Sequence, residues 1–211
     1  MDWRRFAGMV LLAVPLMAGR AHAQDAATIV AHGSGGTPAC ATCHGAQGQG
    51  NAGAGFPRLA GDPAEYLRAQ LEAFAAGTRQ NPIMMPIAKT LNAAQMEAIA
   101  QYFAGLTPPP MVQVPATGLG ADLALYGRAA DRLPACEKCH GPGGVGVAPS
   151  FPALAGQPAA YIEAQIEAWQ KKQRPPGPLG LMPAIAARLS PTDTKAVSTY
   201  FASLAAPEKQ P

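Results

Sequence analysis

The sequence predicts an all-α protein built from two copies of one helical unit. Three observations lead to this prediction. Five blocks of sequence recur at a nearly constant spacing, apolar residues repeat at helical intervals in both copies, and no segment alternates with the period of a β-strand. Gly (23) and Pro (22) are frequent among the 211 residues, so we expect short helices joined by irregular loops.

The start of the chain, residues 1–23, has the features of a cleaved secretory signal. Arg4 and Arg5 precede the apolar stretch FAGMVLLAVPLMAG, and small residues before and at Ala23 form a cleavage site. The apolar stretch is shorter than the roughly 20 residues that a membrane span needs. The sequence therefore predicts export to the periplasm, with cleavage near Ala23.

Charge argues against a nucleic-acid-binding protein. Charged residues make up 14% of the chain, and the full sequence carries a formal net charge of +3. Residues 1–23 contain three of the arginines and one aspartate, so the mature chain would be close to neutral. A protein that binds nucleic acid through phosphate contacts normally presents a basic surface, and this one is not expected to.

The repeats define the domain organisation. Each block recurs 95 to 98 residues later in the chain. The pairs are PACATCHG 38–45 with PACEKCHG 134–141, FPRLAG 56–61 with FPALAG 151–156, AEYLRAQLEAF 64–74 with AAYIEAQIEAW 159–169, IMMPIAKTL 83–91 with LMPAIAARL 181–189, and IAQYFAGL 99–106 with VSTYFASL 197–204. We therefore expect a first domain over 24–106, a proline-rich, semi-rigid linker over 107–118 and a second domain over 119–211.

Helix boundaries follow from capping signals. Asp62, with Pro63 at the first helical position, predicts the start of a helix that Gly77 ends. A last helix is expected to begin at Asn92 in the first copy and at Ser190 in the second. The loop 45–61 carries few side chains that could fill a core. A loop of this length needs something to organise it, and a buried prosthetic group would do so.

A Cys-x-x-Cys-His motif in each copy predicts covalent heme attachment. The motifs are Cys40–His44 and Cys136–His140. Two cysteines one helical turn apart can add to the two vinyl groups of heme, and the following histidine then faces the iron. Zinc, a redox dithiol or structural disulfides would explain the cysteines less well, because none of them accounts for the histidine after each second cysteine.

Methionines at matched positions are candidates for the second axial ligand. Met84 lies seven residues before Leu91, and Met182 lies seven before Leu189. Met85 stays open as an alternative to Met84, because a proline follows it as one follows Met182. Ligation by His and Met leaves no free iron position for a substrate, so the pattern favours an electron carrier over an enzyme. Met96 is interpreted as a packing residue.

Several further residues are expected to support the heme. The carbonyls of Pro57 and Pro152 would accept from the Nδ1–H of the two histidines. The remaining candidates could either contact the heme or have an ordinary structural role. For Tyr66 and Tyr161 the choice is between propionate bonding and core packing, whereas for Arg79 and Arg174 an exposed, solvated position is expected over propionate bonding.

The repeated motifs resemble the diheme cytochrome c4 family over essentially the whole mature chain. The resemblance implies two tandem class I cytochrome c domains related by a pseudo-twofold axis, each with one covalently bound heme c. Carried over, the heme-anchoring residues are Cys40, Cys43, Cys136 and Cys139, and the iron ligands are His44, Met84, His140 and Met182. The stretch PPGPLG at 175–180 makes the second ligand loop three residues longer than the first.

The resemblance also implies partners. Members of the family carry electrons between the quinol-oxidising bc complex and terminal oxidases, and some associate peripherally with the membrane. The alternative is an electron-accepting subunit of a periplasmic dehydrogenase, because the diheme subunit of flavocytochrome c sulfide dehydrogenase has similar motifs. In either case the chain is expected to be a periplasmic diheme electron carrier.

Overall fold

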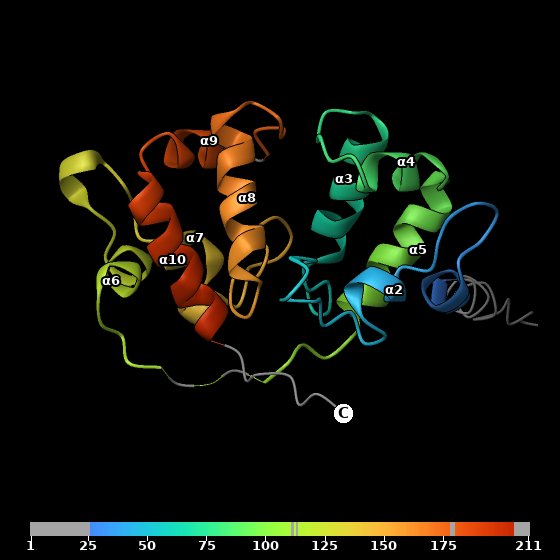
Figure 1. Ribbon diagram of the computed structural model, residues 1–211, viewed down its shortest axis with the longest axis horizontal. Helices are drawn as coiled ribbons and strands as arrows, with labels where there is room; N and C mark the ends of the chain where they lie inside the picture. The colour runs from blue at the N-terminus through green and yellow to red at the C-terminus, as the bar shows by residue number, and fades with distance from the viewer. Residues whose placement is uncertain (1–25, 111, 113, 178–179, 205–211) are drawn as a thin grey trace, which may run out of the picture.

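The computed structural model describes residues 26–110, 112, 114–177 and 180–204, so the predicted signal 1–23 lies outside it. The described residues form short helices and loops with isolated β-bridges and no strand, which confirms the all-α prediction. Two lobes lie side by side, and we call them the first half (26–106) and the second half (119–204) (Figure 1).

The two halves contain the same helices in the same order. In the first half a short helix over 26–32 precedes α2 (Ala41–His44), α3 (Ala64–Ala75), α4 (Met84–Lys89) and α5 (Ala93–Ala104). In the second half the helices are α6 (Leu119–Leu125), α7 (Glu137–His140), α8 (Ala159–Gln170), α9 (Leu181–Ala186) and α10 (Pro191–Ser203), with 3₁₀ turns at Ala129–Asp131 and Pro142–Gly144. Figure 1 shows α3 and α8 facing each other where the halves meet.

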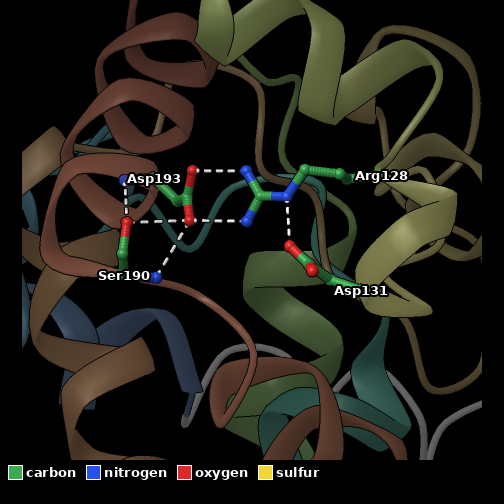
Figure 2. Close-up of polar contacts among 4 residues, drawn as sticks. All are labelled: Arg128, Asp131, Ser190 and Asp193. Carbon is green, nitrogen blue, oxygen red and sulfur yellow. Dashed lines mark hydrogen bonds and ion pairs between the residues drawn. The ribbon is translucent and has the colours of Figure 1, made fainter.

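The last helix of each half begins where the sequence predicts. Asn92 and Ser190 are the N-caps of α5 and α10, and each forms a reciprocal capping box, with Gln95 and with Asp193 respectively. Asp193 also accepts two hydrogen bonds from the two terminal nitrogens of Arg128, each 2.8 Å long, in an end-on pair that Figure 2 shows. Gln95 stands at the corresponding place in the first half and carries no charge.

The predicted cap of α3 is wrong. The N-cap position is Pro63, and no side chain caps the helix. Asp62 is 2% exposed, and its Oδ1 instead accepts a hydrogen bond of 2.8 Å from the backbone N–H of Ala153 in the second half. A carboxylate that satisfies a buried N–H of another domain cannot also turn back to its own helix.

Sequence reasoning missed the helices that open each half, 26–32 and α6. Both are short, and α6 contains a glycine, so neither has a strong helical pattern. Gly120 is required by packing, because a Cβ there would lie 2.3 Å from the carbonyl oxygen of Ala196 in α10. The backbones of α6 and α10 therefore approach closely and cover one side of the second core.

The segment between the halves is extended where the structure describes it. Residues 107–110, 112 and 114–117 contain no helix. A Cβ on Gly61 would lie 3.0 Å from Pro108, and the N–H of Val112 donates to the carbonyl of Leu204 over 2.9 Å. The linker is thus fixed to both halves. The domain boundaries at 106 and 119 stay a prediction.

Candidate functional sites

Each Cys-x-x-Cys-His motif forms a single helical turn. Cys40 precedes α2 and Cys136 precedes α7, and the histidine is the last residue of each helix. All four cysteines are free and partly buried. Burial raises the pKa of the Cys40 thiol, and it raises that of Cys136 to about 11. A reactive redox dithiol needs a lowered pKa, so the geometry does not favour that interpretation.

Both histidines are buried and held by the carbonyls that the sequence predicts. Each is 7% exposed, and Nδ1 lies 2.9 Å from the carbonyl oxygen of Pro57 for His44 and 2.7 Å from that of Pro152 for His140. Burial lowers the pKa of both imidazoles, although the carbonyl bond acts the other way. A neutral ring that donates from Nδ1 leaves the lone pair of Nε2 free to bind a metal.

The glycine-rich loop after each histidine is organised around it. The N–H of Gly50 donates to the backbone carbonyl of His44 over 2.8 Å, and that of Gly146 donates to the backbone carbonyl of His140 over 2.7 Å. Both glycines have positive φ, and a Cβ on Gly50 would lie 2.6 Å from the backbone nitrogen of Arg58. Glycine is needed there because the loop must pass close to the peptide group that fixes the histidine.

A largely apolar cavity in the second half brings the predicted ligands together. Cys136, Cys139, His140 and Met182 all line it, as do side chains of α8 and α10. Tyr66 and Asp62 of the first half complete its wall. The cavity of the second half is therefore closed in part by the first.

In the first half, Cys40, Cys43 and His44 lie together in one turn, and Met84 opens α4. Met84 and Met85 are both partly buried. The methyl group of Met85 points toward Gly77, just after α3: a Cβ built on that glycine would lie 3.8 Å from it. Met96 is 6% exposed and packs in the first core, as predicted.

The donor set fits heme better than a bare metal ion. Within the described ranges no group of three or more His, Cys, Asp or Glu side chains is placed to hold an ion. Two thiols, one neutral imidazole and an apolar cavity are instead what a covalently attached macrocycle requires. The four partly buried thiols and the two held histidines thus agree with heme in each half.

A pseudo-symmetric network of six side chains joins the halves. The residues come in pairs 95 positions apart: Tyr66 and Tyr161, Gln70 and Gln165, and Arg79 and Arg174. Arg79 donates to the hydroxyl of Tyr161 over 3.0 Å and to Gln165 over 2.6 Å, and Arg174 donates to the hydroxyl of Tyr66 over 2.8 Å and to Gln70 over 3.2 Å.

The exposed position expected for the two arginines is wrong. Arg79 is 5% and Arg174 is 8% exposed, and each guanidinium also stacks on an aromatic ring of its own half, over Phe74 at 4.4 Å and over Trp169 at 4.0 Å. The signal that could have revealed them was their shared spacing with the tyrosines. Lys171, by contrast, is exposed.

Comparison of this chain with the sequences and solved structures of other proteins identifies the fold. The family model for cytochrome c matches residues 23–107, and that for subunit III of cbb3-type cytochrome c oxidase matches residues 126–201. A cytochrome c4 of Pseudomonas aeruginosa is 35% identical over 89% of this chain and 93% of its own length. The crystal structure of reduced cytochrome c4 from Pseudomonas stutzeri superimposes with a TM-score of 0.75 at 32% identity, over 86% of this chain and 98% of that one.

The chain belongs to the diheme cytochrome c4 family. It consists of two cytochrome c domains in tandem, and it carries two covalent heme c groups, one on Cys40 and Cys43 and one on Cys136 and Cys139. This diheme cytochrome is an electron carrier and not an enzyme.

Other relatives of this diheme cytochrome have a more specific name. The "thiosulfate dehydrogenase electron acceptor" of Thiomonas intermedia is 50% identical over 78% of this chain and 77% of its own length. That of Stutzerimonas stutzeri is 44% identical over 92% of each. A solved thiosulfate dehydrogenase of Marichromatium purpuratum, in its as-isolated form, has a TM-score of 0.80 at 40% identity. The match covers 86% of this cytochrome and 40% of that longer chain.

Proposed function

We propose that this cytochrome accepts electrons from a dehydrogenase that oxidises thiosulfate and passes them on one at a time. One observation carries the proposal: the two relatives named as acceptors for such an enzyme are 50% and 44% identical, against 35% for a relative named cytochrome c4. This favours the acceptor role over that of a general carrier between the bc complex and an oxidase. The sequence offers the acceptor role as its alternative, with a sulfide dehydrogenase as the example.

The test of this role is a direct electron-transfer assay. The oxidised protein, with both hemes attached, is mixed with a purified thiosulfate dehydrogenase and thiosulfate, and heme reduction is followed by absorbance. We expect two electrons to be taken up per chain, at a rate that saturates with the concentration of this cytochrome. If the protein were reduced by a quinol-oxidising bc complex and not by the dehydrogenase, the general carrier role would replace the proposed one.

We also propose the axial ligands of the two irons. His44 and Met84 would hold the first iron, and His140 and Met182 the second. The shared cavity of His140 and Met182 supports the second set, and the equivalence of α4 and α9 supports the first. Heme supplies an iron that changes oxidation state by one electron without forming or breaking bonds to a substrate.

The polypeptide would control that electron exchange in three ways. The thioether sulfur of methionine favours the reduced iron, whereas a held imidazole favours the oxidised one, so the pair sets the reduction potential. The apolar side chains of α8 and α10 exclude water from the second site. Tyr66, Tyr161, Arg79 and Arg174 would face the propionates, whose charge the two buried guanidinium groups would offset.

We further infer that the protein acts in the periplasm. The signal pattern over residues 1–23, which lies outside the described residues, supports export, and heme attachment to cysteines suits that compartment. No helix of the described part of the chain is long and apolar enough to cross a membrane. Peripheral membrane association stays a prediction. N-terminal sequencing of the exported protein would show whether the chain is cleaved near Ala23.

A further inference from the structure

The two peptide groups that fix the histidines also take part in the contact between the halves. The peptide group of Pro152 and Ala153 accepts from His140 through its carbonyl and donates through its N–H to Asp62 of the other half, over 2.7 Å and 2.8 Å. The peptide group of Pro57 and Arg58 does the same with His44 and Gln157, over 2.9 Å and 3.0 Å. Each histidine is therefore linked through one peptide group to a side chain of the opposite half.

The two links end in different chemical groups. Asp62 and Gln157 stand at equivalent positions, 95 residues apart, and are 2% and 3% exposed. Gln157 is a neutral amide that also donates to the carbonyl of Arg58 over 2.9 Å. Asp62 ends in a carboxyl group. Burial raises its pKa to about 6, while the nearby positive charge of Arg58 acts the other way, so the group is ionised at pH 8.

A carboxylate bound to a peptide N–H changes the carbonyl of the same peptide group. Its charge polarises the conjugated amide and places more negative charge on the oxygen, and hydrogen bonds in such a chain strengthen one another in a buried site. A stronger acceptor at Pro152 draws the Nδ1 proton of His140 and makes Nε2 a stronger electron donor to a metal. Electron donation stabilises oxidised iron and lowers its reduction potential.

We propose that Asp62 of the first half tunes the heme of the second half, by acting on His140 through the peptide group of Pro152 and Ala153. The corresponding link to His44 ends in the neutral amide of Gln157, so the interface lowers the potential of the second heme relative to the first. Asp62 is a positioning and tuning residue, since it touches neither histidine. The inference depends on the proposed ligation of iron by His140.

Asp62→Asn tests the proposal, because asparagine keeps an oxygen that can accept from Ala153 and removes only the charge. The potential of each heme is measured at pH 8 by redox titration followed by NMR, with the two hemes assigned through contacts to side chains of each half. We expect the reduction equilibrium of the second heme to shift by about tenfold toward the reduced form, about 59 mV for one electron, with the first heme unchanged.

A matched variant reverses the experiment. Gln157→Glu places a carboxylate at the equivalent position of the other link and should lower the potential of the first heme only. The Nδ1–H resonance of the linked histidine, recorded in the reduced protein, reports the strength of its hydrogen bond. It should move to lower frequency in Asp62→Asn and to higher frequency in Gln157→Glu.

Three outcomes would overturn the proposal: unchanged potentials in both variants, equal shifts at both hemes, or a shifted potential with an unmoved Nδ1–H resonance. The last would mean that the charge acts through space. Failure of the ligation itself looks different, since the unaltered protein would then show a high-spin signal from the second heme. If Asp62→Asn did not fold, Gln157→Glu alone would decide.

Discussion

The environments of His44 and His140 are nearly the same. The side-chain contacts that stabilise each half internally are not. Both rings are equally buried, both donate to a proline carbonyl, and both lie edge-on to a phenylalanine at 6.2 Å and 6.1 Å. Outside this shell the halves use different chemistry. The second half pairs Arg128 with Asp193, whereas the first joins Thr37 to Thr90 through their hydroxyls over 2.6 Å. Charge, and not histidine geometry, is thus where the duplicated halves have diverged.

Loss of one heme should have the largest effect and should show how far each half depends on the other. We expect Cys136→Ala with Cys139→Ala to leave one heme, detected by mass and by heme absorbance, and to loosen the second half. An empty apolar cavity costs about 24 cal/mol per Å³. Cys40→Ala with Cys43→Ala is the matched control. Limited proteolysis should cut only the half without heme. Cleavage of both halves in either variant would show that they fold as one unit.

Removal of an axial methionine should have the next largest effect. Met182→Ala should convert the second heme to a high-spin form that binds carbon monoxide, and lower its potential by on the order of 0.2 V. In the first half, Met84→Ala should do the same and Met85→Ala should not. The thioether-to-iron charge-transfer band in the absorption spectrum shows in each variant whether methionine still binds the iron. The opposite result for the neighbouring pair would assign Met85 as the ligand.

The symmetric network between the halves predicts nearly equal effects of its two arginines. Arg79→Met or Arg174→Met leaves one buried tyrosine hydroxyl without its donor and each glutamine with one donor in place of two, at a cost of about 1–3 kcal/mol of unfolding free energy each. Burial raises the pKa of Tyr66 to about 12, so that hydroxyl stays protonated. Denaturant titration measures the loss, with exposed Arg188→Met as the control. Each glutamine keeps one arginine donor in the single variants and loses both in the double variant, so the double variant should lose more than the sum.

Markedly unequal losses from Arg79→Met and Arg174→Met would break this comparison. They would mean that the two arginines make matching contacts but contribute different amounts of unfolding free energy. The longer ligand loop of the second half, 175–180, would be the first place to look, because it directly follows Arg174.

Much of each half could be predicted from the sequence, because the relevant signals are local or repeated. The heme motifs, the proline carbonyls and the capping boxes of α5 and α10 all follow from residues close together in the chain. The interface could not be predicted in this way. Asp62 resembles a helix cap and Arg79 resembles a surface residue until the other half is brought against them. A local pattern cannot show that a partner lies 91 residues away at Ala153.

The smallest effect is expected at the ion pair that only the second half has. Asp193→Gln gives α10 the same capping residue as α5 and removes the charge that Arg128 binds. Hydrogen bonds from Arg128 hold the pKa of Asp193 well below its usual range. The pair therefore stabilises the second half above about pH 4, where the unfolded carboxyl is ionised, and this contribution is lost as the pH falls through the lower, folded pKa.

The melting temperature of the second half of Asp193→Gln should therefore fall at pH 7 and approach that of the unaltered protein in strong acid, while the first half does not change. Calorimetry over a pH series, with Gln95→Asp as the reverse variant, measures this. Gln95→Asp should gain little, because Ser34 takes the place of Arg128 in the first half. Each of the two forms the isolated β-bridge just before the heme motif, Ser34 with Thr37 and Arg128 with Leu133. A pH-independent loss in Asp193→Gln would show that the cap, and not the charge, was the stabilising element.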